Sequence, residues 1–455
     1  MSFKSTLATF AGKSSYWILH NIFHRGSSLP GKIALKIDPE ILKEIGKNYD
    51  VIVITGTNGK TLTTALTVRL LKNKYPELIT NPSGSNMEQG IVGTFLKASK
   101  KKQKNLAILE IDEANVIKIT RYIKPILFVF TNIFRDQLDR YGEIYTTYKK
   151  IIDGVKLAPN ATIIANGDEP IFNSVNLPNK IIYYGFHLHP EDDNKDLKAP
   201  INTDGILCPK CQHIIHYHEI IYANLGNYFC PNCDFKRPKL NHFVNKLIQL
   251  TPKQSIFQID NTDFTFNTGG LYNIYNVLAA YTVAKFFNIK DEIIKNILLD
   301  DKKVFGRQEV INIEDKKVTM MLIKNPVGFN QVVNTALSDS KPFTLVTLLN
   351  ANYADGIDTS WIWDGNFEML VNAKLSNGQK QIKQTILGGE RYKDIVFRFK
   401  VAGQKEIIEE PKLDKIIDLI KQAPTKNIYV FATYTATLQF RNILSKYNYI
   451  TEGIE

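Results

Sequence analysis

The sequence has no apolar stretch that approaches the length of a membrane-spanning helix, and its N-terminus lacks the continuous apolar core of a signal peptide. We therefore expect a cytoplasmic protein. Cysteine is also scarce, with four residues among 455. Disulfide bonds between them are disfavoured in the cytoplasm, so these few thiols are better explained by another role.

Acidic side chains are fewer than basic ones. The sequence has 57 lysines and arginines and 45 aspartates and glutamates, which gives a formal net charge of +12. This excess favours anionic partners such as a nucleotide, pyrophosphate, nucleic acid or an anionic membrane face, without choosing among them. The composition, 44% hydrophobic and 22% charged, is that of a globular protein. The chain length predicts two or three domains.

The most informative segment is residues 51–61, where an apolar strand runs into a turn bounded by Gly56 and Gly59 and then into a helix beginning near Lys60. Glycines let peptide N–H groups point into one concavity, to which the helix start and the lysine add positive charge. The segment predicts a phosphate-binding loop with a threonine placed to bind the Mg²⁺ of a nucleoside triphosphate; its residues are Gly56, Thr57, Asn58, Gly59, Lys60 and Thr61. Ile54 stands where the general motif has a further glycine, so a plain glycine turn with a solvated lysine is the alternative.

A helical segment with a turn at Pro30-Gly31 precedes Asp50, and strands then alternate with helices. Such alternation predicts an α/β fold with a parallel sheet covered on both faces. Strands are expected at 51–55, 106–111, 126–130, 161–165 and 181–184, and in the C-terminal part at 318–323, 343–349 and 428–432.

Ligands of a parallel sheet bind at the carboxyl ends of its strands. Glu110 ends the second expected strand, where its carboxylate either binds the Mg²⁺ or caps the next helix. Asn132 follows the third strand in a polar run that extends to residue 142. Asn273 and Asn276 share a face of the helix after Gly270, so that one caps the helix and the other contacts a base.

The four cysteines form two C-x-x-C pairs, Cys208 with Cys211 and Cys230 with Cys233, separated by a short segment. Two such pairs at this distance are typical of a zinc ribbon, in which four thiolates hold a tetrahedral zinc ion. With four thiolates the coordination shell is closed, so we predict a structural zinc and no catalysis by it.

Several of these segments together resemble the Mur ligases, which form amide bonds through acyl phosphates. Residues 56–61 resemble their ATP loop, and Glu110 resembles their magnesium-binding glutamate. A polar segment of the family is resembled by the run that contains Asn132, Asp136, Asp139 and Arg140. A second family segment is resembled by the helix start with Asn273 and Asn276. Arg307 resembles an arginine that reaches the nucleotide phosphates. Gln137 and Ile151 depart from the family, because they stand where a metal-binding histidine and a carbamoylated lysine are usual. A second Mg²⁺ site is therefore not predicted.

The C-terminal part resembles the MurT family, the synthetase subunits of lipid II isoglutaminyl synthases, in residues 324–330 and 355–364. The resemblance implies ATP-dependent amidation of the D-glutamate α-carboxyl of the lipid II stem, with ammonia from a separate glutaminase subunit. It also implies that Asp358 completes the catalytic residues of that glutaminase and that Lys324 contacts the substrate carboxylate or a phosphate. The resemblance also implies that the enzyme acts at the inner face of the cell membrane. One face of an early helix carries Leu7, Phe10, Trp17, Ile18 and Ile22, which we expect to pack on the domain, with contact to a membrane surface as the lesser alternative.

The predicted organisation is a helical lead-in at 1–48, a Mur-ligase-like ATP-binding domain at 49–310 with the zinc ribbon inserted at about 200–240, and a C-terminal α/β domain at 311–455. One alternative is a conventional Mur-type amino-acid ligase, which needs an N-terminal substrate domain larger than the segment before Asp50. Another is a zinc-ribbon ATPase that binds nucleic acid, but acidic residues dilute the charge around the ribbon and we expect no nucleic-acid partner. A pure interaction protein is the third.

Overall fold

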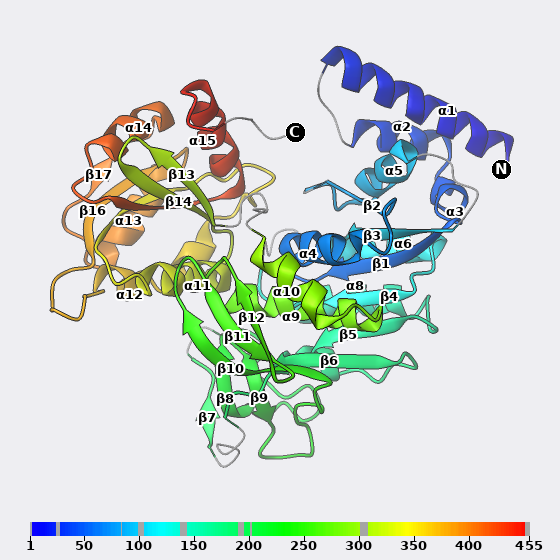
Figure 1. Ribbon diagram of the computed structural model, residues 1–455, viewed down its shortest axis with the longest axis horizontal. Coiled ribbons are helices and arrows are strands. Elements are labelled where there is room, and N and C mark those ends of the chain that lie inside the picture. Colours follow the sequence, from blue (N-terminus) through cyan, green and yellow to red (C-terminus); the bar gives the residue numbers. More distant parts are fainter. Residues whose placement is uncertain are drawn as a thin grey trace.

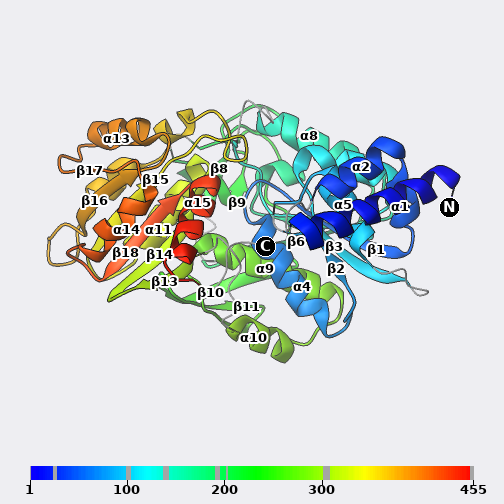
Figure 2. The same ribbon diagram turned by 90° about the horizontal axis from the view of Figure 1, so that it is seen from above.

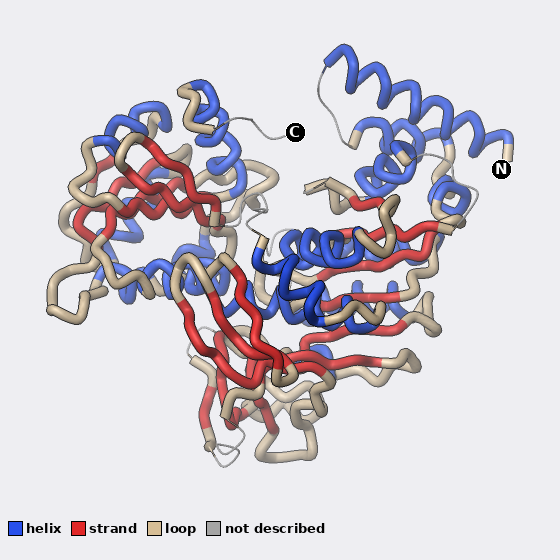
Figure 3. The backbone as a smooth tube through the Cα atoms, viewed as in Figure 1, coloured by secondary structure: helices blue, strands red, loops and turns tan. Residues whose placement is uncertain are grey.

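The structure is a computed structural model that describes residues 2–23, 28–82, 84–98, 104–136, 143–189, 195–200, 203–300 and 308–450. These residues form two large sheets, each covered by helices on both faces, and one small sheet (Figure 1). The expected α/β class is confirmed. Figure 3 shows strands and helices alternating along most of the chain.

The larger sheet has the strand order β12-β11-β10-β6-β5-β4-β1-β3-β2. All pairs from β2 to β10 are parallel, and β11 and β12 are antiparallel additions. Its strands are β1 (Tyr49–Thr55), β2 (Ile79–Thr80), β3 (Asn105–Glu110), β4 (Leu127–Phe130), β5 (Thr162–Asn166), β6 (Ile181–Phe186), β10 (His242–Leu250), β11 (Ser255–Ile259) and β12 (Thr262–Phe266).

Two hydrophobic cores lie on the two faces of this sheet. One is formed with α4 (Lys60–Lys72), α9 (Leu271–Phe286) and α10 (Asp291–Leu299). The other is formed with α1 (Phe3–Ile18), α2 (Leu29–Ile37), α3 (Ile41–Ile45), α5 (Glu88–Lys97), α6 (Val116–Tyr122) and α8 (Ile144–Val155). Ile151 belongs to this second core and is fully buried, so the position that carries a lysine in many Mur ligases is apolar and packed here.

The expected turn at Pro30-Gly31 is wrong, because both residues lie in the first turn of α2. Proline is favourable there, since the first N–H groups of a helix make no intrahelical hydrogen bond. A Cβ on Gly31 would lie 1.9 Å from the carbonyl oxygen of Gln89, so this glycine allows α2 to approach α5 closely. The dipeptide therefore starts a helix and packs it.

The second large sheet has the order β13-β14-β18-β15-β16-β17, parallel except for β13. Its strands are β13 (Glu309–Ile313), β14 (Lys316–Leu322), β15 (Phe343–Leu348), β16 (Ile382–Gly388), β17 (Ile408–Glu409) and β18 (Asn427–Ala432). One face is covered by α11 (Pro326–Leu337), α12 (Phe367–Val371) and α13 (Tyr392–Val401), and the other by α14 (Leu413–Lys421) and α15 (Tyr434–Lys446). This sheet lies at one end of the molecule and α1 at the other (Figure 1 and Figure 2).

The small sheet consists of β7 (Leu197–Lys198), β8 (His216–Tyr222) and β9 (Leu225–Phe229), inserted between β6 and β10. It carries the four cysteines and a small core of its own. Across the described residues, no helix combines the length and the apolarity that crossing a bilayer requires.

Candidate active site

The turn between β1 and α4 has the backbone of a phosphate-binding loop. Gly56 and Gly59 have φ angles of 127° and 85°, which residues with a side chain rarely adopt. A Cβ on Gly59 would lie 2.0 Å from Asn276 Oδ1, so space excludes a side chain as well. Since α4 begins at Lys60, its N-terminus opens onto the same turn and favours an anion there.

Lys60 is buried and folds back over this turn. Its Nζ donates to the carbonyl oxygens of Gly56 and Thr57 and lies 3.2 Å from Glu113 Oε1. Burial by itself would lower the pKa of Lys60, but Glu113 and the other carboxylates nearby raise it above the usual value. The lysine is therefore protonated at neutral pH, in the position where a phosphate needs a positive charge.

Glu110 lies at the end of β3, where it is the parallel partner of Ile54 in β1. Asn81 hydrogen-bonds both its N–H and its carbonyl oxygen, each at 2.9 Å, and Asn86 donates to its Oε1 at 3.3 Å. A fixed, buried carboxylate beside a phosphate loop is a donor that Mg²⁺ accepts, and the hydroxyl of Thr61 in the first turn of α4 is another. The donor set fits a nucleotide-bound magnesium ion.

Asparagines connect the loop to both sheets. Asn58 donates its N–H to Asn132 Oδ1 at 2.8 Å, and Asn132 donates back to the Asn58 carbonyl oxygen at 3.1 Å. The Asn58 and Asn325 side chains exchange two hydrogen bonds of 3.3 and 3.1 Å. Because Asn132 follows β4 and Asn325 follows β14, the phosphate loop is held by the larger sheet and by the second sheet together.

A cavity of about 630 Å³ opens beside the loop and is lined by residues of both sheets and of the inserted segment. Asn58 and Asn132 lie at its polar side, while Tyr272, Val327 and Val332 supply apolar surface. Tyr222, from β8 of the cysteine-bearing sheet, also lines it. Apolar walls with a few amides beside a phosphate loop suit a purine ring attached to phosphates.

The structure separates the two asparagines of α9. Asn276 lines the cavity and lies near Thr63, whose Oγ1 is 3.4 Å from its Oδ1. Asn273 is fully buried, and its Nδ2 donates to the carbonyl oxygen of Gly269 at 2.6 Å, just before the helix. Arg307 lies outside the described residues, as do Gln137, Asp139 and Arg140.

A second cavity, of about 400 Å³, lies where the polar segment after β4 meets the loop that follows β15. Its lining carries more acidic than basic side chains, with Asp136, Asp355, Asp358 and Asp364 against Arg135 and Lys324. Lys324 lines both this cavity and the one beside the phosphate loop. The two spaces are therefore neighbours separated by one lysine.

Lys324 is held between the two sheets. Its Nζ lies 2.5 Å from Asp136 Oδ2 and 3.2 Å from the carbonyl oxygen of Thr57 in the phosphate loop. The other oxygen of Asp136, Oδ1, is buried and has no hydrogen-bond partner within the described residues. A buried carboxylate oxygen without a partner is costly, so this atom is suited to accept a hydrogen bond from a bound ligand.

The loop after β15 presents Asp358 to solvent. Asp355 is buried and anchors the loop, because it accepts hydrogen bonds from the N–H groups of Thr435 at 2.7 Å and Asn352 at 3.0 Å. Asp358 is exposed and accepts from the N–H and Oγ of Ser360 at 2.8 and 2.7 Å. One aspartate thus fixes the loop and the other keeps its carboxylate at the surface.

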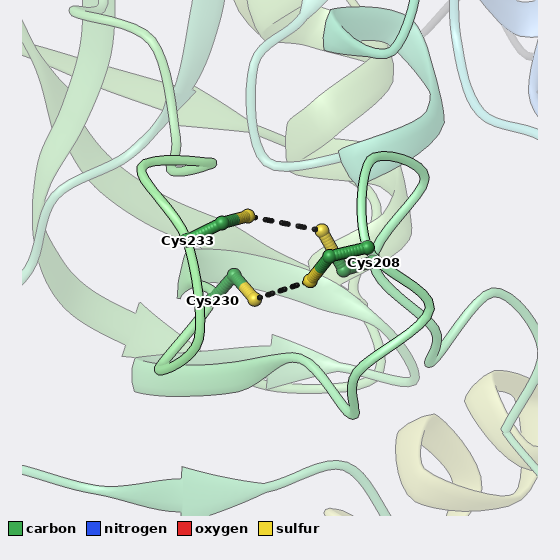
Figure 4. A group of neighbouring side chains, drawn as sticks. Cys208, Cys230 and Cys233 are labelled. Carbon is green, nitrogen blue, oxygen red and sulfur yellow. Dashed lines mark hydrogen bonds between the residues drawn. The ribbon is translucent and has the colours of Figure 1, made fainter.

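The four cysteines form one cluster (Figure 4). Their sulfur atoms all lie within 4.8 Å of one another, with Cys208 and Cys233 3.6 Å apart and Cys211 and Cys230 3.5 Å apart. Four thiolates at the usual zinc–sulfur distance have sulfurs roughly 3.8 Å apart, and disulfide-bonded sulfurs would be much closer. The cysteines are not disulfide-bonded, and their arrangement is compatible with a tetrahedral zinc ion.

The cysteine-bearing sheet is firmly attached to the end of β5. Arg237 forms a 2.8 Å ion pair with the buried Asp168, and Asn224 donates to Glu169 Oε1 at 2.9 Å. Glu169 also accepts a hydrogen bond from the N–H of Ile133, the residue after Asn132, which contacts the phosphate loop. Burial raises the pKa of Glu169 to about 8. Hydrogen bonds thus connect the inserted segment to the residue next to Asn132, which lines the cavity beside the phosphate loop.

Comparisons with known proteins agree with this geometry. Residues 54–284 match the family model of the Mur ligase middle domain, and residues 322–437 match that of the MurT ligase C-terminal region. The chain is 48% identical to the lipid II isoglutaminyl synthase (glutamine-hydrolyzing) subunit MurT of Streptococcus pneumoniae, over 98% of each chain. The chain belongs to the MurT family.

Another MurT relative, from Staphylococcus aureus strain COL, is 33% identical over 87% of this chain and 86% of its own. Among solved structures, a pseudomurein peptide ligase type C from Methanothermus fervidus has a TM-score of 0.65 at 22% identity, covering 90% of this chain and 81% of that one. MurF ligase from Thermotoga maritima, solved in complex with ADP, has a TM-score of 0.60 at 15% identity, covering 91% and 85%. These likenesses confirm the Mur-ligase-like fold of this MurT family member.

Two residues of the site, Glu113 and Tyr222, were not singled out by the sequence, and one contact was not predicted. Glu113 follows Glu110 by three residues and pairs with Lys60, a signal that was readable but ambiguous. The contact of Asp136 with Lys324 joins residues 188 positions apart, and no local pattern predicts it. Tyr222 had no signal at all, because only the packing of the inserted sheet brings it to the cavity.

Proposed function

We propose that this chain is the synthetase subunit of a lipid II isoglutaminyl synthase. It converts the α-carboxyl of D-glutamate in the lipid II stem peptide to a carboxamide, using ATP and ammonia. A carboxylate resists attack by ammonia because it is negatively charged and has a poor leaving group. Transfer of the γ-phosphoryl group of ATP to a carboxylate oxygen releases ADP and gives an acyl phosphate that ammonia can attack.

The first step belongs to the cavity beside the phosphate loop. The N–H groups of residues 56–61 and the ammonium of Lys60 hold the phosphates, and Asn132 and Asn276 position the nucleotide. Magnesium, when bound, neutralises phosphate charge, and we assign Thr61 and Glu110 to it. Arg307 is the further phosphate contact we propose from the family resemblance.

The second step belongs to the acidic cavity. Ammonia attacks the carbonyl carbon, the bond from carbon to the phosphate oxygen breaks, and inorganic phosphate leaves while the nitrogen loses one proton. We assign to Lys324 the contact with the substrate carboxylate and then with the leaving phosphate, and its position in the lining of both cavities supports this. The aspartates that line this cavity, among them Asp136 and Asp358, supply acceptors for the amine protons.

Ammonia is mostly protonated at neutral pH, so an enzyme that needs the neutral form benefits from making it on site. We propose a glutaminase subunit as the partner, with the exposed carboxylate of Asp358 completing its catalytic residues. The task of such a carboxylate is to orient a histidine and stabilise its cation. Zinc held by Cys208, Cys211, Cys230 and Cys233 is structural in this proposal, and the complex works at the cytoplasmic face of the membrane that carries its lipid-linked substrate.

The observation that carries the proposal is the position of Lys324, which lines both the cavity beside the phosphate loop and the second cavity, whose lining includes the exposed Asp358. The test uses the chain with its glutaminase, Mg-ATP and lipid II, supplied either with ammonium or with glutamine, and mass spectrometry separates amide from acid. We expect Asp358→Ala to abolish the glutamine-driven reaction and to leave the ammonium-driven reaction within about twofold of the unaltered chain.

Asp418→Ala is the matched control, because Asp418 is an exposed aspartate on α14, away from both cavities. It should change neither reaction. Equal loss of both reactions in the Asp358 variant would contradict the role given to this residue. Absence of amide from both nitrogen sources with the unaltered complex would contradict the proposed function itself.

A further inference from the structure

Helix α1 packs onto the protein through its small side chains. Its buried residues are Ser5, Ala8, Thr9 and Gly12. A Cβ added to Gly12 would lie 2.6 Å from Leu96 Cδ1 and 3.3 Å from Ala34 Cβ, so the helix lies close against α5 and α2. A surface helix usually turns its large apolar residues toward the core, and α1 does the reverse.

The large apolar side chains of α1 point to solvent. Phe3 is 87% exposed, Phe10 69% and Trp17 63%, and Leu7 and Ile18 are exposed as well. These residues recur at the three- and four-residue spacing of one helix face. Single exposed apolar residues are common, but a row with three aromatic rings marks a contact surface.

The first 37 residues of the sequence carry charge of one sign. Asp and Glu are absent from the first 37 residues of the sequence, whereas Lys4, Lys13, Arg25, Lys32 and Lys36 are present. The four lysines are exposed. The first acid, Asp38, is buried and accepts a hydrogen bond from Ser5 Oγ at 2.6 Å, so its charge is turned inward.

We propose that α1 docks onto the anionic surface of a lipid bilayer, lying in the plane of the interface. Phe3, Phe10 and Trp17 enter the headgroup region, a depth that aromatic side chains prefer, and the lysines contact lipid phosphates. The helix lies at the end of the molecule opposite the six-stranded sheet (Figure 1 and Figure 2), so its outer face is accessible while the cavities stay open. It is an interfacial helix, because no described helix meets the requirements of a membrane span.

Charge favours a bilayer over a second copy of the chain. A dimer through α1 would bring two sets of lysines together, and neither α1 nor α2 carries an acid to pair with them. Phospholipid headgroups supply negative charge at the density such a face needs. The proposed function explains why docking to a membrane would be useful, but the test below measures binding without any reaction.

The experiment is cosedimentation of the full chain with vesicles of phosphatidylcholine alone or mixed with phosphatidylglycerol. We expect binding to the mixed vesicles that weakens with added salt, and at least about tenfold weaker binding to phosphatidylcholine alone. Phe10→Glu combined with Trp17→Glu should reduce binding to the mixed vesicles by at least about tenfold.

The control variant is Ile293→Glu combined with Leu299→Glu, which makes the same charge change at exposed apolar residues of α10. It should bind as the unaltered chain does. In a second readout, mixed vesicles should shift the tryptophan emission to shorter wavelength. Trp17→Phe should remove most of that shift, because the other two tryptophans lie in the loop after β15. It should keep the binding, because phenylalanine retains an aromatic ring.

The proposal would be overturned if the unaltered chain failed to bind mixed vesicles. It would also be overturned if the two double glutamate variants, in α1 and in α10, lost binding equally. Sedimentation analysis that shows a dimer of the unaltered chain and a monomer of the Phe10 and Trp17 variant would overturn it as well. None of these outcomes bears on amide formation from detergent-dispersed lipid II, so failure of docking and failure of the proposed function remain distinguishable.

Discussion

At the scale of single residues, Lys60 shows how a buried charge is kept ready for a ligand. Its ammonium contacts two carbonyl oxygens of its own loop and Glu113, so it is satisfied without any phosphate present.

We predict that Lys60→Ala lowers kcat/KM about a hundredfold or more, because one positive donor to the transferring phosphate disappears. Both the ammonium-driven and the glutamine-driven reactions should fall together, as measured by initial rates of ADP release. Lys72→Ala, an exposed lysine at the end of the same helix, is the control. Unchanged amide formation in the Lys60 variant would remove the phosphate loop from the mechanism.

Glu169 gives a prediction on pH. Burial raises its pKa from 4.5 to about 8, so between these values the folded chain holds a proton that the unfolded chain has released. Stability therefore falls as the pH rises through this window, by at most about 1.4 kcal/mol for each pH unit. Glu169→Gln, which cannot ionise, should lack this contribution.

Melting temperatures across that window measure the effect. The melting temperature of the Gln variant should increase relative to that of the unaltered chain as the pH rises, and the difference should level off above about pH 8. A difference that stays constant with pH would mean that Glu169 is ionised in the folded protein throughout.

At the scale of elements, the parts that the sequence predicts are those with local signals. The phosphate loop, the parallel strands and the two C-x-x-C pairs each depend on neighbouring residues. Pro30-Gly31 shows the limit, because the same dipeptide suits a turn or a helix start, and only the approach of α5 decides between them. Contacts such as Tyr222 with the nucleotide-facing cavity depend on packing and had no local signal.

The cysteine-bearing sheet should influence nucleotide binding through Tyr222. We predict that Cys211→Ser combined with Cys233→Ser removes bound zinc, lowers the melting temperature by several degrees and weakens nucleotide affinity. Metal analysis and calorimetric titration with a non-hydrolysable ATP analogue measure these effects.

Tyr222→Ala separates the two contributions. It should keep the zinc and still weaken nucleotide binding about tenfold, whereas Tyr222→Phe, which keeps the ring, should bind almost normally. Normal nucleotide affinity in the Ala variant would mean that the ribbon contributes stability only.

At the scale of the whole molecule, the two large sheets meet at the phosphate loop through Asn58 and Asn325. Asn325 also caps α11, because its Oδ1 accepts from the N–H of Gly328 at 2.8 Å. A substitution that tests the contact between the sheets must therefore preserve the cap.

Asn325→Ser meets this condition, since serine is a good N-cap but is too short to reach Asn58. We predict a nearly unchanged melting temperature without nucleotide and a smaller increase when the ATP analogue is added, as measured by differential scanning fluorimetry. A drop in the nucleotide-free melting temperature would show that the substitution acts through the helix cap instead.

The shared position of Lys324 has a consequence for the two cavities. One ammonium group touches the carbonyl oxygen of Thr57 on the ATP side and the Asp136 carboxylate on the amine side. A shift of the phosphate loop around a bound nucleotide would be transmitted through the Lys324 side chain to the second cavity, where we propose that ammonia reacts. We infer that a displacement of the phosphate loop on ATP binding would also displace the Lys324 ammonium in the lining of the second cavity, without any long-range rearrangement.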